Sequence, residues 1–183
     1  MKGDGEVEDL SVTNQQALII ASNTALWQSP KAWQVLHGEI TDLDQDGLSE
    51  VTLLVRRPFQ PWPIDRFLPY PGRIRDFHDA AGFSCHVIMI GWRRGAFREV
   101  WAGSAMSQPL QSFAAGDLTG DGKQELIALE GNYTDLPVGP ARSLTAWEWN
   151  GFGFTLIARS QGPFRNLRLF GQAGGGEIVV VER

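Results

Sequence analysis

The sequence predicts an all-β protein made of four-stranded antiparallel repeats, the unit from which the blades of a β-propeller are built. Two observations lead to this fold class. Short apolar runs bounded by Gly, Asn, Asp or Pro recur along the chain, whereas long helical periodicity is scarce. A nine-residue stretch with glycine at its sixth position and glutamate at its ninth also recurs, in whole or in part, which indicates an internal repeat.

The apolar runs are the expected strands. Each is rich in β-branched, aromatic or other apolar residues and lies close to a turn-forming residue. They are QALIIAS (16–22), EVTLLVR (50–56), CHVIMIGW (85–92), AFREVWAG (96–103), QELIALEG (124–131), SLTAWEWN (143–150), FTLIARS (154–160) and EIVVVER (177–183).

Two segments, 87–101 and 144–158, align with each other without a gap. Each has a turn between two strand-like halves, at Arg94-Gly95 in the first and at Gly151-Phe152 in the second. Each also carries a matched Trp and Phe on either side of its turn: Trp92 and Phe97, and Trp149 and Phe154. Both segments are therefore expected to form β-hairpins.

The nine-residue stretch fixes the boundaries of the repeats. Its closing glutamates are Glu8, Glu50, Glu125 and Glu177. The long interval after Glu50 is explained by an insertion at 56–82, between the second and third strands of its repeat. The predicted units are a partial blade at 1–30, a blade at 31–104 that contains the insertion, a blade at 105–160, and a partial blade at 161–183.

Two complete blades do not close a propeller, because known propellers have at least four. We therefore expect an incomplete propeller that is either a segment of a longer chain or is completed by head-to-tail association with another chain, since open flanks would expose unpaired strand edges. The alternative is that the ends pack differently and form a compact sandwich.

The acidic loops resemble those of a known family. Asp42-x-Asp44-x-Asp46-Gly47-x-x-Glu50 and the stretch FAAGDLTGDGKQELIAL (113–129) are similar to the FG-GAP/VCBS repeats of integrin-type β-propellers. The resemblance implies a propeller fold, with a nine-residue calcium loop between the first and second strands of a blade. It implies no particular ligand.

The loop residues themselves favour calcium. Side chains at positions one, three and five can turn their oxygens inward because glycine at position six permits a sharp turn, while position seven offers a carbonyl and position nine a carboxylate. An all-oxygen set suits Ca²⁺ better than Zn²⁺, which favours His or Cys. The predicted ligands of the first loop are Asp42, Asp44, Asp46, the Leu48 carbonyl and Glu50.

The second loop is expected to bind calcium more weakly, because Thr119 replaces an acid at position three. Its predicted ligands are Asp117, Thr119, Asp121, the Lys123 carbonyl and Glu125. The copy at 169–177 keeps Glu177 but has Leu169, Gly171 and Ala173 at the other side-chain ligand positions, so it is expected to bind no metal. The N-terminal copy lacks its first ligand position. Two calcium ions are therefore expected. The alternative for each loop is a solvated Asp/Gly turn without an ion.

Composition excludes other classes. The net charge of −5 and the absence of a basic run argue against a nucleic-acid partner. No nucleophile, phosphate-loop or zinc motif is present, so no catalytic residue is predicted and the chain is expected not to be an enzyme. No apolar run is long enough to span a membrane, and no signal peptide begins the sequence as given. Calcium loops of the weak, extracellular kind favour an extracytoplasmic location.

The insertion is the candidate binding loop. Among its prolines and arginines it carries Trp62, Arg66 and Tyr70, residue types that suit a protein surface or a sugar ring. The alternative is that its aromatic residues only cover an edge strand. The sequence thus predicts a non-catalytic, calcium-binding propeller module for protein–protein interaction. The second candidate is a carbohydrate-binding propeller that uses this loop, and the third is a hydrolase whose site lies outside this segment.

Overall fold

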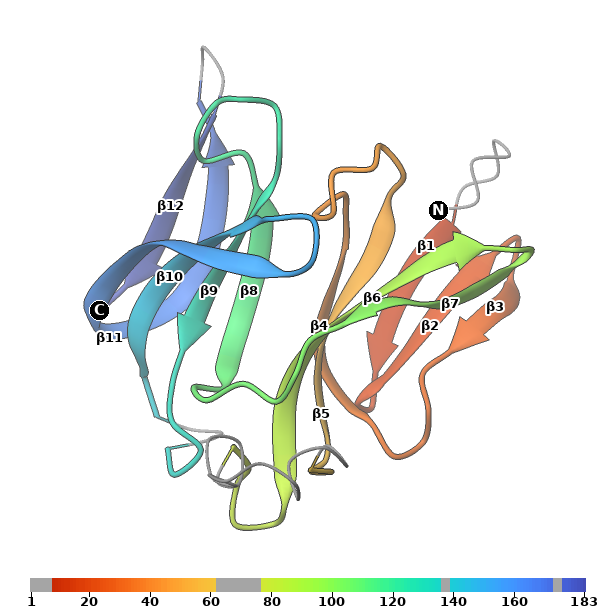
Figure 1. The fold of residues 1–183 in the computed structure, drawn as a ribbon, viewed down its shortest axis with the longest axis horizontal. Helices are drawn as coiled ribbons and strands as arrows, with labels where there is room; N and C mark the ends of the chain where they lie inside the picture. The colour runs from red at the N-terminus through yellow and green to blue at the C-terminus, as the bar shows by residue number, and fades with distance from the viewer. Residues whose placement is uncertain (1–7, 62–76, 136–138, 173–175) are drawn as a thin grey trace.

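The computed structural model describes residues 8–61, 77–135, 139–172 and 176–183, and every regular element in these ranges is a β-strand (Figure 1). The prediction of an all-β fold is confirmed. The twelve strands of the described residues are β1 (Glu8–Thr13), β2 (Gln16–Ala21), β3 (Thr24–Gln28), β4 (Gln34–Thr41), β5 (Glu50–Pro58), β6 (Phe83–Arg93), β7 (Ala96–Ala102), β8 (Leu110–Gly116), β9 (Glu125–Glu130), β10 (Ala141–Trp149), β11 (Phe154–Gly171) and β12 (Glu177–Glu182).

The strands form three antiparallel sheets in which each strand pairs with its neighbours in sequence. The sheets have the orders β1-β2-β3, β4-β5-β6-β7 and β12-β11-β10-β9-β8. They hold three, four and five strands among the described residues, so the uniform four-stranded sheet expected from the sequence is seen only in β4–β7. The first three residues of the predicted insertion, 56–58, belong to β5, and β6 begins directly after its last residue.

The four glutamates that close the repeated stretch occupy equivalent places. Each is the first residue of a strand: Glu8 of β1, Glu50 of β5, Glu125 of β9 and Glu177 of β12. The repeat found in the sequence therefore marks a repeated position in the fold, where a loop ends and a strand begins.

Both predicted hairpins are present, as β6–β7 and β10–β11. In the first, Trp92 pairs across the strands with Phe97, and their rings lie 5.1 Å apart at 67°. In the second, Trp149 pairs with Phe154, at 5.2 Å and 70°. The gapless alignment of the two segments thus corresponds to the same cross-strand aromatic pair, with edge-to-face packing that stabilises each hairpin.

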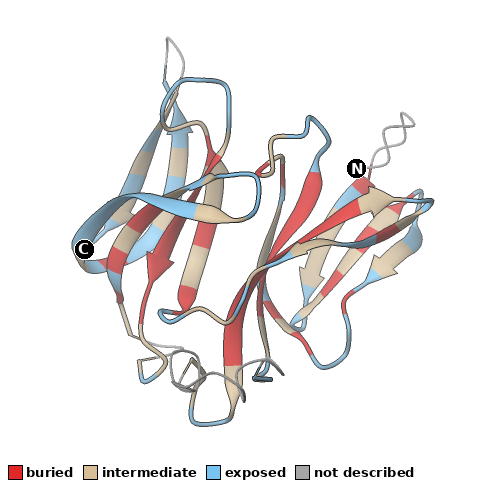
Figure 2. Cartoon of the chain, viewed as in Figure 1, coloured by how far each residue is buried: buried red, intermediate tan, exposed pale blue. Residues whose placement is uncertain are grey.

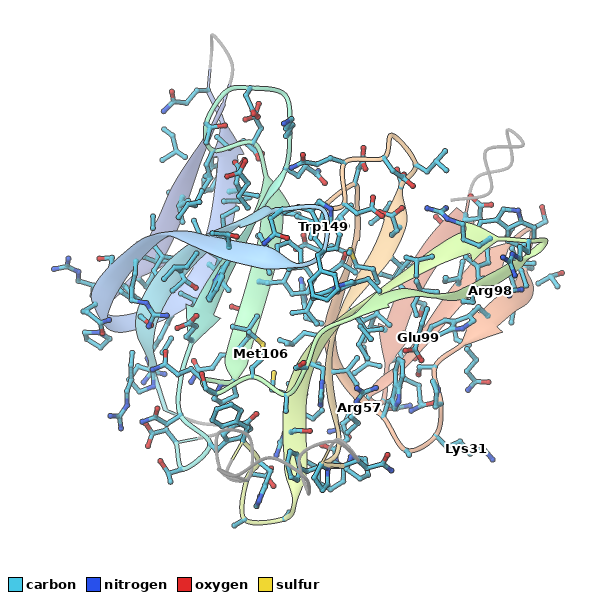
Figure 3. The ribbon with its side chains drawn as sticks, viewed as in Figure 1. Lys31, Arg57, Arg98, Glu99, Met106 and Trp149 are labelled. Carbon is cyan, nitrogen blue, oxygen red and sulfur yellow. The ribbon has the colours of Figure 1, made fainter. Side chains whose placement is uncertain are left out.

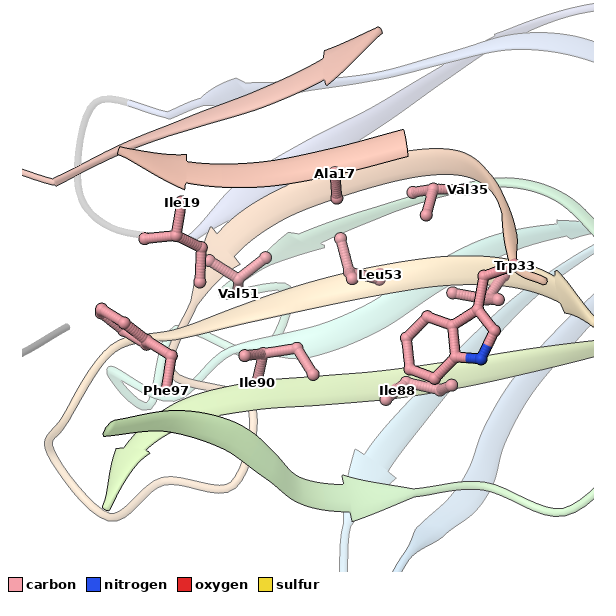
Figure 4. Packing of buried hydrophobic residues seen from close by; sticks show 10 residues of the cluster. Ala17, Ile19, Trp33, Val35, Val51, Leu53, Ile88, Ile90 and Phe97 are labelled. Carbon is pink, nitrogen blue, oxygen red and sulfur yellow. The ribbon is translucent and has the colours of Figure 1, made fainter. Parts of the chain in front are cut away.

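The core lies between the sheets, and the sheet β4–β7 is covered on both faces (Figure 2). Leu53 and Ile88 face the sheet β1–β3, in the cluster drawn in Figure 4. Leu54 and Met89, their neighbours in sequence, pack instead against Leu110, Phe113, Leu126 and Ala128. Burial on both faces explains why β5 and β6 are continuous apolar runs without the alternation of a half-exposed strand.

The strand β11 is unusually long at 18 residues. Its first part, up to Phe164, pairs with β10, whereas its last part, from Arg165, pairs with β12. It therefore crosses the predicted boundary between the units 105–160 and 161–183, so that the same strand forms part of both units.

No helix in the part of the chain that the structure describes is long and apolar enough to cross a membrane, which agrees with the expectation from the sequence.

Candidate metal centre

Two acidic loops, 42–49 between β4 and β5 and 117–124 between β8 and β9, lie on the same side of the molecule (Figure 1). A hydrogen bond joins them, because the backbone N–H of Asp42 donates to Oε1 of Gln124 at 2.7 Å. These residues are 82 positions apart in the sequence. The fold thus places the first loop directly beside the second.

The first loop is anchored by Leu43, which is fully buried, and turned by Gly47, whose φ of 81° belongs to the left-handed region. Its carboxylates accept hydrogen bonds from the backbone of the same loop: Leu48 N–H donates to Asp46 at 2.9 Å and Asp46 N–H to Asp44 at 3.3 Å. Asx-type bonds of this kind hold a short polar turn in one conformation.

Three carboxylates of this loop converge. Asp42, Asp44 and Glu50 each place an oxygen within 4.8 Å of the other two, and no other cluster of this kind is found among the described residues. Glu50 has no solvent exposure, and neither of its carboxylate oxygens has a hydrogen-bond partner. A buried carboxylate without a partner is costly, and a cation bound between the three groups would supply one.

The electrostatics agree with this geometry. Burial, followed by the charges of Asp44, Asp46 and Asp42, raises the pKa of Glu50 to about 8. Burial is also the largest cause of the raised pKa of Asp44, to which the charges of Asp46 and Asp42 add. Without a cation, Glu50 is therefore largely protonated at neutral pH, and binding of a metal ion would displace that proton.

Asp46 is held differently from the other predicted ligands. One of its oxygens lies 2.5 Å from Nη2 of Arg93, at the end of β6. Arg93 was not predicted as part of this site, because it lies 47 residues from Asp46 in the sequence and outside both acidic loops. Its charge lowers the pKa of Glu50 and Asp44, so it offsets part of the repulsion in the loop. The Leu48 side chain is 48% exposed, in keeping with a position that would offer only its carbonyl.

The second loop has the same turn but a more satisfied set of side chains. Asp117 accepts hydrogen bonds from the backbone N–H groups of Gly120 and Asp121 through Oδ1, and from that of Gly122 through Oδ2. Asp121 accepts one from Lys123. Thr119 is exposed. The aspartates of this loop are thus occupied by its own backbone.

The glutamate that closes the second loop also has a partner. Glu125 is buried, and its Oε2 accepts a hydrogen bond from Leu118 N–H at 2.8 Å. Burial raises its pKa, and that bond lowers it in part. The contrast with Glu50, which has no partner, makes the first loop the better prepared of the two for a cation.

Trp62, Arg66 and Tyr70, the ligand-binding residues predicted in the insertion, lie outside the described residues. Cys85 is fully buried in β6, and burial raises the pKa of its thiol to about 12. It is therefore a small core residue and not a nucleophile.

A Ser–His pair in β6 was not predicted from the sequence. Ser84 Oγ lies 2.7 Å from His86 Nε2, and His86 Nδ1 lies 2.9 Å from the carbonyl oxygen of Gly103. Because a carbonyl only accepts, Nδ1 carries the proton and Nε2 accepts from the Ser84 hydroxyl. Ser84 has no solvent exposure, so a substrate has no access to its hydroxyl. The pair ties β6 to the segment after β7.

Burial of His86 predicts a loss of stability in acid. Burial lowers its pKa to about 4, from about 6.5. The unfolded chain therefore takes up a proton below pH 6.5 while the folded protein does not, and stability falls as the pH drops from 6.5 towards 4, by on the order of 3 kcal/mol. The free-energy difference between wild type and His86→Gln, measured by urea unfolding, should shrink over this range. A difference that stays constant from pH 7 to pH 4.5 would contradict this account.

Comparison with known proteins does not assign the chain to a family. No protein-family model matches the chain, and no curated protein is significantly similar to it. The resemblance to FG-GAP/VCBS repeats therefore rests on the loop residues and remains a prediction.

Proposed function

We propose that this chain is a non-catalytic, calcium-binding module of the β-propeller type, in which Ca²⁺ pins a loop between two strands and the rigid frame presents its loops to a protein partner. The observation that carries the proposal is Glu50. Its carboxylate is fully buried, has no hydrogen-bond partner and converges with those of Asp42 and Asp44. Such an arrangement is unfavourable without a cation.

The chemistry of the donor set selects the ion. Three carboxylates with no His or Cys among them favour a hard cation, and the carbonyl of Leu48 is the further ligand that the loop pattern supplies. Asp42 and Asp44 would hold the ion from the loop, and Glu50 from the first residue of β5. The ion would thereby fix the loop to the strand, which makes its role structural.

The propeller part of the proposal is supported by the arrangement of the strands. The strands β4–β7 form a four-stranded meander whose first connection is the acidic loop. The strands β8–β11 repeat this order, with the second acidic loop in the same place. The strands β1–β3 follow Glu8 as the last three strands of β4–β7 follow Glu50. We infer that the three-stranded and five-stranded sheets are incomplete and fused versions of one blade.

The outer face of the last sheet supports the incomplete ring. Phe170 pairs with Ile178 across β11 and β12, and both side chains are about half exposed, at 51% and 45%. A blade at the end of an open ring leaves such a face uncovered. In this proposal a further repeat or a second copy of the chain covers it.

Calcium titration of chelator-treated protein by calorimetry tests the function. We expect binding in the range of about 10⁻⁴ to 10⁻³ M, the range of extracellular calcium modules, with a proton released at neutral pH as Glu50 ionises. Full occupancy of the first loop and weaker occupancy of the second would give two ions. The absence of stoichiometric binding at millimolar calcium would refute the proposal. An affinity in this range would also support the extracytoplasmic location, because cytosolic calcium would leave the site empty.

A further inference from the structure

A cavity of about 310 Å³ lies between the sheet β4–β7 and the sheet β8–β12. Its floor is formed by Val87 of β6 and Leu126 of β9, both buried. Its walls include Trp101, Trp147 and Met106. Met106 is labelled in Figure 3, where it lies between the two sheets.

The walls are held in place before any ligand arrives. Trp101 Nε1–H donates to the carbonyl of Phe152 at 2.8 Å, and Trp147 Nε1–H donates to Thr145 Oγ1 at 2.9 Å. The segment that carries Met106 is fixed to β6 because Met106 N–H donates to Cys85 O. Since both indole N–H groups are used, the two tryptophans offer the cavity only the apolar surface of their rings. A preformed site of this kind loses little entropy on binding.

One end of the cavity is polar but carries no net charge. Glu130, almost fully buried, pairs with Arg159 at 2.9 Å and accepts hydrogen bonds from Ser143 and Thr145. Among the described residues that line the cavity, these two are the only charged ones, and their charges cancel. The described lining therefore provides no excess charge with which to attract an ionic ligand.

The rim of the same end has hydrogen-bonding capacity to spare. Gln108 uses its Oε1 to accept from Arg159 at 2.9 Å, whereas its Nε2 makes no hydrogen bond to the described part of the chain. Ser104 and Ser107 line the cavity as well, and both residues are exposed. A purely apolar occupant would cover these groups without replacing their water, which costs free energy.

We propose that this cavity binds one pyranose ring of a neutral carbohydrate. A volume near the lower limit for ligand sites holds a single ring. The C–H face of a pyranose packs against Trp101 and Trp147, and its hydroxyl groups bond to Gln108 and to the serines of the rim. None of the described residues that line the site belongs to an acidic loop or to the insertion.

The test is saturation-transfer NMR and calorimetry with four methyl pyranosides (glucoside, galactoside, mannoside and fucoside), each with and without calcium. We expect at least one to bind with a Kd of about 1 mM or tighter. Gln108→Leu removes the free amide, and Ala105→Phe fills the cavity from a residue of its lining. Each should weaken binding at least about tenfold. Gln28→Leu, the same change at an exposed position of β3, should bind as wild type does.

Three results would overturn the proposal. The first is no binding of any of the four glycosides at about 20 mM. The second is unchanged binding in both Gln108→Leu and Ala105→Phe, with circular dichroism showing that the variants are folded. The third is loss of binding in Trp62→Ala with retention in the two cavity variants, which would place the sugar on the insertion. Binding that persists in chelator would leave the cavity proposal intact even if the calcium proposal failed.

Discussion

Calcium is expected to raise the unfolding temperature of the wild-type protein, and Glu50→Gln is expected to lose the larger part of that increase. At about 5 mM calcium and a Kd in the extracellular range, one site stabilises the folded state by about 1 to 2 kcal/mol, which corresponds to roughly 3 to 6 °C for a domain of this size. Glu50 supplies the buried carboxylate that would contact the ion from β5. Glutamine keeps the shape of the glutamate side chain but removes its negative charge. Thermal unfolding followed by circular dichroism in calcium and in chelator measures the difference.

In chelator, Glu50→Gln is expected to increase the stability of the protein at high pH. The pKa of Glu50 is raised to about 8 in the folded protein, from about 4.5. The folded state therefore binds more protons than the unfolded state between these values, and stability is lost as the pH rises from 4.5 to 8. A glutamine does not ionise, so Glu50→Gln should be more stable than wild type at pH 8.5 in chelator, and calcium should narrow this difference by stabilising only the wild type.

The loss of the calcium-dependent increase separates a metal ligand from an ordinary buried residue. The matched control is Glu99→Gln, the same change at an exposed glutamate of β7 (Figure 3), which should alter neither measurement. A Glu50→Gln variant that keeps the full calcium-dependent increase would show that Glu50 is not a ligand.

The repeat was predictable because its signals are local. Gly47 and Glu50 stand at fixed places in a loop whose turn needs a left-handed residue, and each closing glutamate starts a strand. The two aromatic hairpins were predictable for the same reason, since a turn with Gly95 or Gly151 at positive φ separates a matched Trp and Phe. These features depend on a few residues that are adjacent in the sequence.

The strands β1 and β3 were harder to find. The turns on either side of β2 are built by Asn14-Gln15 and Ser22-Asn23, all at positive φ. These pairs form the same two-residue hairpins as Arg94-Gly95, but without glycine they are weak turn signals in a sequence. The length of β11 was also not predictable, because it passes Gly162 and Pro163, residues that usually end a strand.

The site was predictable only in part, because its electrostatics come from distant segments. Arg93 pairs with Asp46, and Gln124 of the second acidic loop accepts a hydrogen bond from the backbone N–H of Asp42. Nothing in the sequence indicates that either residue lies beside the first loop. The cavity beside Trp101 depends on how two sheets pack, and no periodicity in the sequence specifies that arrangement. Local chemistry thus predicted the loop, whereas its partners required the fold.

Leu53→Ala and Leu54→Ala are expected to destabilise the protein by similar and large amounts, about 2 to 5 kcal/mol each. Both side chains are fully buried, although they point to opposite faces of β5. Leu53 packs in the cluster shared with the sheet β1–β3, and Leu54 in the cluster shared with the sheet β8–β12. Urea unfolding of each variant gives the two free energies, with Leu156→Ala, at a side chain that is 40% exposed, as the control expected to cost far less.

The double variant distinguishes a stack of three sheets from a two-layer sandwich. If β4–β7 is a middle layer, the two leucines belong to separate interfaces, and their effects should add apart from a small coupling through the shared backbone. In a sandwich, β5 would face water on one side, and one of the two substitutions would then cost less than about 1 kcal/mol. A middle layer with cores on both faces is what stacked propeller blades require. A small effect of either substitution would therefore remove the main energetic support for the propeller proposal, whatever the calcium measurements gave.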